Sequence, residues 1–498
     1  MSGRHYYITT PIYYVNDVPH IGHAYTTLAC DVLARFKRLD GYDVRFLTGT
    51  DEHGQKVEKA AAAAGLAPKA FTDKVSQAFR DLVAKMNYSP DNFIRTTEPR
   101  HYKASQALWE KLVASGDIYL GSYAGWYSVR DETYFVEGET EVGPDKKRRA
   151  TATGAEVEWV EEPSYFFKLS AWADRLLAFY EQNPGFIGPD SRRNEILSFV
   201  RGGLQDLSVS RTSFSWGVPV PGDTKHIMYV WLDALTNYIT ECGYPDTNDR
   251  LWKYWPADLH MVGKDIIRFH CVFWPAFLMS AGIAPPKRVF AHGWWTNEGQ
   301  KISKSLGNVI DPNELVATYG LDAVRYFLLR EVPFGNDGDF QRKALIGRLN
   351  ADLANAYGNL CQRVLSIVAK NCESKVPAKG PLQAADTALL DRARGLLPIV
   401  RSEIEDQGFH RALTRVVTDY AEKHQMRKAN DPQVRVEDVR RGLSAVVSVK
   451  LQDPQFEGQT KAKLGNSEVR GAVESSFGQF LRDFLHENPR EAKPLVEQ

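Results

Sequence analysis

The hydrophobic pattern of the first 90 residues alternates between stretches typical of strands and stretches with the period of a helix. Residues 4–14 are rich in Tyr, Ile and Thr and predict a strand, and residues 44–47 form a second short apolar run. Residues 23–39 and 69–86 carry apolar side chains at helical spacing. The order strand, helix, strand, helix predicts an α/β fold with a doubly wound parallel sheet.

The pattern changes between residues 116 and 216, where short Tyr, Phe, Trp and Val runs are separated by Gly and Pro. This stretch predicts an inserted module that is partly β-structure. After it the alternation of strands and helices resumes. Strands are predicted at 227–231, 259–262 and 289–291, and helices at 266–279 and 315–329. Residues 342–368 predict a further helical region, and residues 375–381 (K-V-P-A-K-G-P) predict a loop between helices.

Composition narrows the class of protein. The 498 residues are 43% hydrophobic and 25% charged, which is typical of a globular chain with several domains. No apolar run approaches the ~20 residues of a membrane span, and the N-terminus does not resemble a signal peptide. The five cysteines are scattered without a C-x-x-C pair, as in reducing compartments. We therefore expect a cytoplasmic protein with no membrane partner. Because basic and acidic residues balance at 62 each, contacts with nucleic acid must come from local patches.

The densest chemical signal is P-I-Y-Y-V-N-D-V-P-H-I-G-H over residues 11–23. It lies where the first predicted strand ends and the first helix begins, which is the ligand-binding edge of an open parallel sheet. His20 and His23 could reach one phosphate at the helix N-terminus, and Gly22 would allow a close approach. Taken alone, His-x-x-His is more often a pair of surface histidines, and a metal site is less favoured because no third ligand cluster is visible.

The second signal is G-Q-K-I-S-K-S-L-G-N over residues 299–308. Lys301 and Lys304 lie among serines and glycines, which predicts a mobile cationic loop able to neutralise a triphosphate. Taken alone, this stretch could equally be a solvated surface loop.

Together the two motifs resemble the signature pair of class I aminoacyl-tRNA synthetases. Five longer stretches resemble the bacterial methionyl-tRNA synthetase family over about residues 4–408: P-I-Y-Y-V-N-D-V-P-H-I-G-H-A-Y, F-L-T-G-T-D-E-H-G-Q-K, S-R-R-N-E-I-L-S-F-V, M-Y-V-W-L-D-A-L-T-N-Y and V-G-K-D-I-I-R-F-H. The chain departs from the family at Ile302, where methionine is usual, and this mild apolar exchange leaves the motif intact.

The resemblance implies a nucleotide site. His20 and His23 would hold the ATP phosphates, and Lys301 and Lys304 would stabilise pyrophosphate as it leaves. Asp265 would bind the ribose. The remaining residues that the resemblance places near ATP are Gly22, Gly263, Lys264 and Ser303. It implies ATP as a substrate with Mg²⁺ as its counter-ion.

The resemblance also implies a methionine site. Asp51 would hold the α-ammonium group by a charge-assisted hydrogen bond, although a helix-capping role also fits its position. The thioether pocket would be lined by Ile12, Tyr14, Trp231, Ala234, Tyr238 and His292. Each aromatic residue taken singly is more often ordinary core. The inserted module often binds zinc in this family, but residues 126–131 contain no cysteine, so we expect neither zinc nor any other metal site.

The family resemblance ends near Phe409, and the tail resembles another family. Three stretches, L-T-R-V-V-T-D-Y-A, E-D-V-R-R-G-L-S-A-V-V-S-V-K and D-P-Q-F-E-G-Q-T-K-A-K-L-G-N-S-E-V-R, resemble the transducer region of the DNA gyrase B subunit. Lys461 matches a lysine that contacts ATP in that family, but the preceding ATPase domain is missing, so we assign it no role. The chain therefore resembles a chimera.

These resemblances predict five segments. The catalytic domain would comprise residues 1–115 and 217–339, separated by an inserted connective module at 116–216. Residues 340–408 would begin a helical anticodon-binding domain, and residues 409–498 would form a short α+β transducer-like segment.

The expected function is that of a methionine–tRNA ligase, which joins L-methionine to ATP as methionyl-adenylate and transfers it to methionine tRNA. We expect a monomer whose tRNA binding is impaired by the replaced tail. Two alternatives stay open: a class I synthetase for another amino acid, and an interaction or DNA-topology module acting through the gyrase-like tail.

Overall fold

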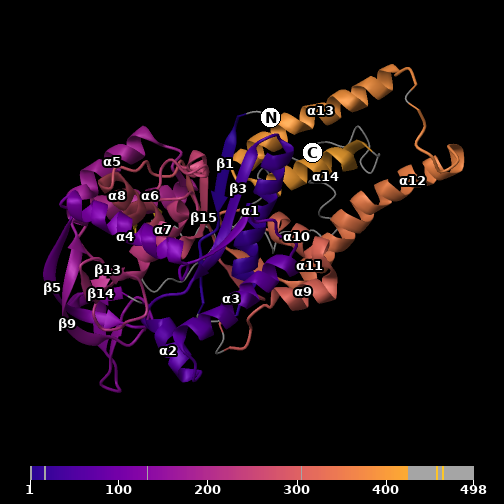
Figure 1. The fold of residues 1–498 in the computed structure, drawn as a ribbon. Coiled ribbons are helices and arrows are strands. Elements are labelled where there is room, and N and C mark those ends of the chain that lie inside the picture. Colours follow the sequence, from indigo (N-terminus) through magenta and orange to yellow (C-terminus); the bar gives the residue numbers. More distant parts are fainter. Residues whose placement is uncertain are drawn as a thin grey trace. The chain divides into compact units, whose positions relative to one another are not determined.

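The computed structural model describes residues 3–15, 18–131, 133–303, 306–378, 380–423, 456–457 and 463–464. The chain divides into two compact units, Met1–Val417 and Thr418–Gln498. In the second unit the described residues are the last six of α14 (Phe409–Lys423) and one antiparallel pair, β20 (Phe456–Glu457) with β21 (Lys463–Leu464). The first unit, shown in Figure 1, holds every candidate site residue.

The first unit is built on a parallel sheet. Its strands are β1 (His5–Thr9), β2 (Tyr13–Tyr14), β3 (Asp43–Asp51), β4 (Asn92–Arg95), β10 (Ile187–Gly188), β15 (Leu259–Gly263) and β16 (Val289–His292). The order is β10-β16-β15-β1-β3, with β2 and β4 both paired to β3, and all of these pairs are parallel. The predicted doubly wound parallel sheet is therefore confirmed.

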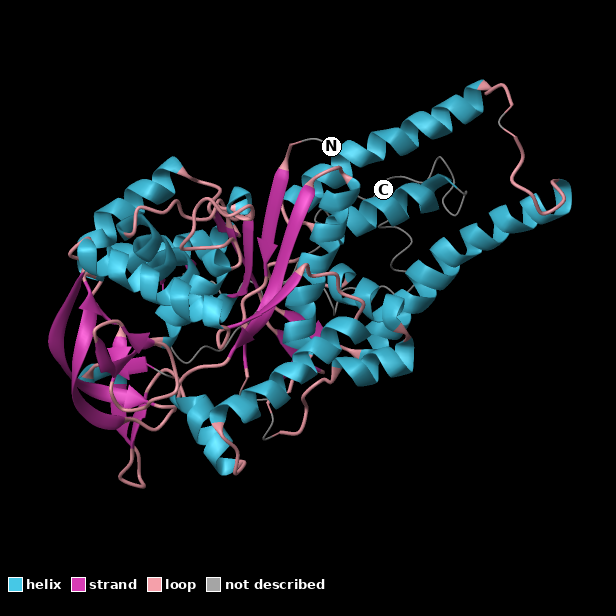
Figure 2. Ribbon diagram, viewed as in Figure 1, coloured by secondary structure: helices cyan, strands magenta, loops and turns pink. Residues whose placement is uncertain are grey.

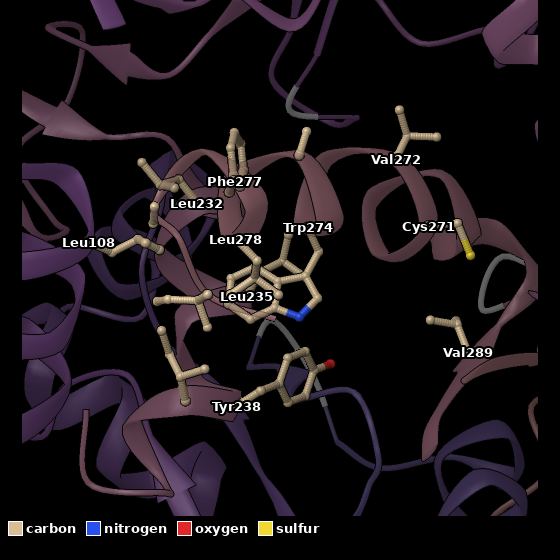
Figure 3. Close-up of a cluster of buried hydrophobic side chains, with 14 of the residues drawn as sticks. Leu108, Leu232, Leu235, Tyr238, Cys271, Val272, Trp274, Phe277, Leu278 and Val289 are labelled. Carbon is tan, nitrogen blue, oxygen red and sulfur yellow. The ribbon is translucent and has the colours of Figure 1, made fainter. Parts of the chain in front are cut away.

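Alternate side chains of the central strands enter two different cores. Tyr6 and Ile8 pack into a core with α1 (Ile21–Leu39) and α10 (Leu321–Arg330), whereas Tyr7 packs into the core on the other face. That second core contains Leu235 and Tyr238 of α7 (Val230–Thr240) and Trp274 of α8 (Trp274–Ser280), which Figure 3 shows as one packed cluster. Since both faces of the sheet are covered by helices, its strands read as continuous apolar runs in the sequence.

The region between β4 and β10 begins with α4 (Pro99–Ala114) and continues into antiparallel β-structure, which stands out in Figure 2. Four strands pair in the order β11-β9-β5-β6, with bounds Leu207–Ser208, Glu158–Phe167, Ile118–Ser128 and Thr133–Phe135. A hairpin of β7 (Thr140–Val142) and β8 (Arg148–Ala150) follows β6. Helices α5 (Ala173–Gln182) and α6 (Asp190–Arg201) flank β10 along the chain.

Two smaller sheets complete the β-structure of the first unit. One has the order β12-β14-β13, with bounds Ser210–Arg211, Asp223–Met228 and Pro219–Val220. The other has the order β18-β17-β19, with bounds Gln300–Lys301, Trp295–Asn297 and Gly338–Phe340. Helices α2 (Gln55–Ala63) and α3 (Pro68–Lys85) lie between β3 and β4 in the chain.

Three predicted elements are wrong in detail. The strand expected at 4–14 is two strands, β1 and β2, with residues 10–12 between them. The strand expected at 227–231 ends at Met228, and the apolar residues that follow open α7 at Val230. A short apolar run cannot by itself distinguish a buried strand from a buried helix. The helix expected at 315–329 is two helices, α9 (Pro312–Tyr319) and α10. Gly320 separates them with a φ of 85°, a conformation that ends the first helix.

Beyond the sheet the first unit is helical. The order is α11 (Arg342–Arg348), the π-helical segment η6 (Leu349–Gly358), α12 (Asn359–Asn371), α13 (Ala384–Glu405) and α14 (Phe409–Lys423), of which the residues up to Val417 belong to this unit. Residues 372–378 and 380–383 lie between α12 and α13 without regular secondary structure, in agreement with the predicted loop, and Figure 1 shows these two helices projecting as a long arm.

The base of the arm is fixed to the sheet domain. Ion pairs join Lys37 to Glu405 and Asp40 to Arg401, and Phe409 of α14 is buried in the core that contains α1. The outer part of the arm exposes apolar side chains, including Leu365 at 65% and Ile367 at 60%. No helix in the described residues is long and apolar enough to cross a membrane.

Candidate active site

A cavity of about 470 Å³ opens at the carboxyl ends of β1, β3, β15 and β16, where parallel sheets commonly bind ligands. Most of the residues singled out in the sequence line it together: Ile12, Tyr14, His20, Gly22, His23, Asp51, Trp231, Ala234, Tyr238, Gly263, Asp265 and His292. They come from segments up to 280 positions apart, so the fold assembles the cavity from both halves of the catalytic region.

The two motif histidines begin α1. His20 is the N-cap, and its Nδ1 accepts a hydrogen bond from the backbone N–H of Gly22 at 3.1 Å. The Nδ1 of His23 accepts the backbone N–H of His20 at 3.1 Å. Because each Nδ1 is an acceptor, each neutral ring carries its hydrogen on Nε2. A side chain at Gly22 would meet the His20 ring at 2.9 Å, so glycine makes room for this cap.

Burial keeps both rings neutral. It lowers the pKa of His20, against an opposing effect of Asp265, and lowers the pKa of His23 well below its usual value, with the neighbouring His20 adding to the shift. The rings lie 3.9 Å apart between centroids at the helix N-terminus. The site therefore offers two neutral Nε2–H donors beside the positive end of a helix dipole, which suits a phosphate chain.

The apolar wall of the cavity comes from α7. Trp231, Ala234 and Tyr238 are spaced three and four apart, so they share one face of the helix. The Trp231 ring stacks on Phe269 at 3.8 Å between centroids and an interplanar angle of 7°. The Tyr238 hydroxyl donates to His270 Nε2 at 2.7 Å, since His270 Nδ1 faces the Ile266 carbonyl at 3.0 Å. This wall is largely aromatic, and a hydrogen bond between two lining residues holds the Tyr238 ring in place.

Asp51 lines the same cavity as the last residue of β3, paired with Tyr14 of β2, and only 7% of it is exposed. Its carbonyl accepts the backbone N–H of Val15 at 3.2 Å. The next residue, Glu52, is fully buried and receives two hydrogen bonds from Arg95 at 2.6 and 2.9 Å. The Asp51 carboxylate is thus presented to the cavity on a rigid strand end.

The β15 end contributes Gly263 and Asp265, which line the cavity beside Trp294. The indole N–H of Trp294 donates to Asp265 at 3.2 Å. Lys264 is placed differently from its neighbours, because its ammonium group pairs with Asp337 at 2.6 Å and lies over the Trp294 ring. The structure therefore separates Lys264 from the cavity lining, whereas Asp265 belongs to it.

The lysine loop follows the hairpin of β17 and β18. Lys301 ends β18 with an exposed side chain outside the cavity lining, and Lys304 lies outside the described residues. Asn308 fixes the base of the loop: its side chain accepts the Ser303 backbone N–H at 2.7 Å and donates to the Lys301 carbonyl at 3.0 Å. The structure thus places the base of the loop without bringing Lys301 or Ser303 into the cavity.

His292 closes the cavity from the end of β16. It is buried, its Nδ1 donates to the Gly293 carbonyl at 2.9 Å, and its Nε2 lies 2.7 Å from the Thr26 hydroxyl. Burial lowers the pKa of His292, which favours a neutral ring.

Several lining residues were not identified from the sequence: Thr26, Lys56, Arg130, Asp131, Phe269, His270 and Trp294. Phe269 and His270 end the V-G-K-D-I-I-R-F-H stretch, where helical spacing from Asp265 and Ile266 could have indicated them. Arg130 and Asp131 come from the inserted module, and nothing in their local sequence indicates that position.

The turn at residues 128–131 is stabilised by polar side chains. The Asp131 carboxylate accepts the hydroxyls of Thr153 at 2.6 Å and Ser128 at 3.2 Å, and Arg130 donates to the Thr153 carbonyl. Among the described residues, no group of three His, Cys, Asp or Glu side chains could hold a metal ion.

Comparison with known proteins gives two separate matches along the chain. Residues 6–365 match the family described as tRNA synthetases class I (M), and residues 405–498 match DNA gyrase B. The methionine–tRNA ligase of Brucella suis biovar 1 is 59% identical over 432 residues, which cover 87% of this chain and 84% of the relative. That of Rickettsia bellii is 63% identical over 373 residues, covering 75% and 72%.

The fold is similar to that of Mycobacterium tuberculosis methionyl-tRNA synthetase in complex with methionyl-adenylate. The TM-score is 0.81 at 57% sequence identity, with 84% of this chain and 83% of the other covered. Both similarities expected from the sequence are therefore confirmed.

Proposed function

The chain belongs to the methionyl-tRNA synthetase family of class I aminoacyl-tRNA synthetases, and we propose that its cavity joins methionine to ATP before transfer to tRNA. This is the reaction of a methionine–tRNA ligase, with methionine, ATP and tRNA as substrates. The observation that carries the proposal is the meeting of the His20–His23 pair, Asp51 and the Trp231 wall in one cavity.

We propose that methionine binds between β3 and α7. The Asp51 carboxylate accepts hydrogen bonds from the α-ammonium group, and the thioether lies against Trp231, Ala234 and Tyr238. A thioether is polarisable and apolar, so aromatic walls favour it over a charged or hydroxylated side chain of similar length. Ile12, Tyr14 and His292 complete this part of the cavity.

ATP binds along the N-terminus of α1 in this proposal. The Nε2–H groups of His20 and His23 donate to the phosphate oxygens, and Asp265 accepts the ribose hydroxyls. A methionine carboxylate oxygen forms a bond to the α-phosphorus while the bond from that phosphorus to the β-phosphate oxygen breaks. Methionyl-adenylate and pyrophosphate result. Lys301 and Lys304 stabilise the charge that accumulates on the leaving pyrophosphate.

Magnesium fits this site as an ion carried by the nucleotide. The lining carboxylates of Asp51, Asp131 and Asp265 do not form a three-ligand group, and Mg²⁺ commonly takes its ligands from substrate phosphates and water. When bound with ATP, Mg²⁺ would neutralise part of the negative charge of the phosphates. The polar turn around Asp131 supports a zinc-free inserted module.

Transfer to tRNA is the step that the tail affects. Methionyl enzymes normally continue into a complete anticodon-binding domain, whereas here residues 405–498 match DNA gyrase B. Specific readout of RNA loops relies on side chains that stack on splayed bases. We therefore propose that adenylate formation is retained and that charging of methionine tRNA is reduced. We further propose a cytoplasmic monomer, and light scattering of the purified protein tests the monomer.

The proposal is tested by methionine-dependent ATP–pyrophosphate exchange run beside a panel of other amino acids. Methionine should stimulate exchange far more than any other amino acid. Stimulation by a different amino acid would contradict the methionine assignment, and no stimulation by any amino acid would contradict the enzymatic function. Pulldown with gyrase A, using the full chain, tests the alternative of an interaction module.

A further inference from the structure

A buried network of two histidines and one carboxylate lies behind the methionine part of the cavity. Asp233 is fully buried on α7, and its two oxygens face two different rings. His53 Nδ1 lies 2.6 Å from one oxygen, and His101 Nε2 of α4 lies 2.7 Å from the other. Both rings are at most 1% exposed, so the network is closed to solvent.

The hydrogens of this network can be assigned from its carboxylate. An ionised Asp233 can only accept, so Nδ1 of His53 carries a hydrogen and donates to it, and in the neutral ring Nε2 then accepts the Tyr102 hydroxyl at 2.9 Å. His101 donates its Nε2–H to the second oxygen. Burial alone would raise the pKa of Asp233, but the two histidines hold that pKa at about 2, so the carboxylate is ionised and both of its oxygens are satisfied.

The network connects the segment that follows Asp51 with α7, two parts of the chain that both line the proposed methionine site. His53 is two residues beyond Asp51, and Asp233 lies between Trp231 and Ala234. Asp233 is not part of the cavity lining. One hydrogen bond therefore fixes the α7 wall against the strand end that presents Asp51, across 180 positions of sequence.

A second buried carboxylate on the same helix provides a matched comparison. Glu241 caps the far end of α7 and is also fully buried. It binds Arg45 of β3 at 2.8 Å, Asn92 of β4 at 2.7 Å and Arg100 of α4 at 3.4 Å. Glu241 thus attaches α7 to the same elements, but at the end away from Trp231 and Ala234.

We propose that His53, Asp233 and His101 are positioning residues that set the separation between Asp51 and the α7 wall, and thereby the affinity for methionine. This inference rests on the proposed methionine site. A hydrogen bond to a charged group is stronger than one between neutral groups, and losing it here would weaken the ammonium and thioether contacts together. The nucleotide contacts of His20 and His23 lie on α1, outside the network, and should be unaffected.

The test compares Asp233→Asn with Glu241→Gln in ATP–pyrophosphate exchange, with KM measured for each substrate. In Asp233→Asn an amide NH₂ faces a histidine N–H, so the KM for methionine should rise about 10-fold or more while the KM for ATP stays within about 2-fold. Glu241→Gln should leave the KM for methionine within about 2-fold. Tyr102→Phe removes only the outer hydrogen bond and should raise the KM for methionine about 3-fold, which keeps the test available if Asp233→Asn does not fold.

Two results would overturn the inference alone: equal rises in the KM for methionine in Asp233→Asn and Glu241→Gln, or parallel rises in the KM for methionine and ATP. An unchanged KM for methionine in Tyr102→Phe would overturn it where Asp233→Asn cannot be purified. Absence of methionine-dependent exchange in the unmodified chain would contradict the proposed function itself, and this inference with it.

Discussion

Replacing His20 with asparagine separates two roles that one imidazole performs at the start of α1. The ring caps the helix through Nδ1, which accepts the Gly22 N–H at 3.1 Å, and in the proposed site its Nε2–H donates to a phosphate. Asparagine is among the best N-cap residues, so His20→Asn preserves the cap. Its amide does not reach as far as Nε2, so the phosphate contact is lost. His20→Ala loses both.

The magnitudes follow from these two interactions. A lost N-cap costs about 0.5–2 kcal/mol of stability, so His20→Ala should unfold at a lower urea concentration, whereas His20→Asn should stay close to the unmodified protein. A lost hydrogen bond to a charged phosphate costs about 1.5–3 kcal/mol. Since each 1.36 kcal/mol is tenfold in rate, adenylate formation should slow by about 10- to 150-fold in both variants.

The assay is ATP–pyrophosphate exchange at saturating methionine, together with urea unfolding of each variant. The phosphate role predicts that His20→Asn lowers kcat and leaves the KM for methionine unchanged, because the contact strengthens in the transition state. If His20→Asn kept the unmodified kcat and only His20→Ala lost activity, the cap would explain the whole effect of His20. The assignment of a phosphate donor would then be refuted.

Four further predictions concern the rest of the site and the tail. Asp51→Ala should lower kcat/KM for methionine about 10- to 150-fold by leaving the ammonium group without its partner, and unmodified kinetics would exclude Asp51 from the site. Exchange should require magnesium and survive a zinc chelator that spares magnesium, and loss of activity with that chelator would contradict the zinc-free assignment. The free energy of unfolding should fall as pH drops from about 6.5 towards 4, because burial lowers the pKa of His270 to about 4. In that range His270 is protonated in the unfolded chain and neutral in the native protein. Urea unfolding at pH 7 and pH 5 measures the difference. Replacing the tail by an intact anticodon domain should raise charging of methionine tRNA strongly while leaving pyrophosphate exchange unchanged, and equal charging by the two proteins would show that the tail is functionally silent.

Local sequence patterns are sufficient to predict some elements and insufficient for others. The helix expected at 23–39 is α1, which begins two residues earlier at Ile21 because His20 caps it. The strand expected at 44–47 continues to Asp51 as β3. Gly49, which looks like a strand boundary, lies inside β3 because the backbone of Ile94 in β4 passes directly beside it. Only the neighbouring strand distinguishes a glycine that ends a strand from one that accommodates a close approach.

The candidate site likewise contains residues that the sequence indicates and placements that only the structure shows. Family motifs were enough to indicate the residues that gather in the cavity, including Asp51 and Trp231. They gave no indication that Lys264 pairs with Asp337 outside the cavity or that Arg130 of the inserted module lines it. Those placements depend on partners far away in the chain.

The sequence by itself determined the alternation of strands and helices that predicts a parallel sheet, and the residue types proposed to meet a phosphate and a thioether. These properties are local: periodicity follows from which face of an element is buried, and motifs follow from the chemistry of single side chains. The sequence did not identify the short sheet strands β4 and β10. Only the tertiary structure decided which ring nitrogen of His20 and His23 carries the hydrogen, and that Asp233 holds His53 and His101 at once. The physical reason is that a buried polar group takes its state from the donors and acceptors around it, and folding brings these from distant segments.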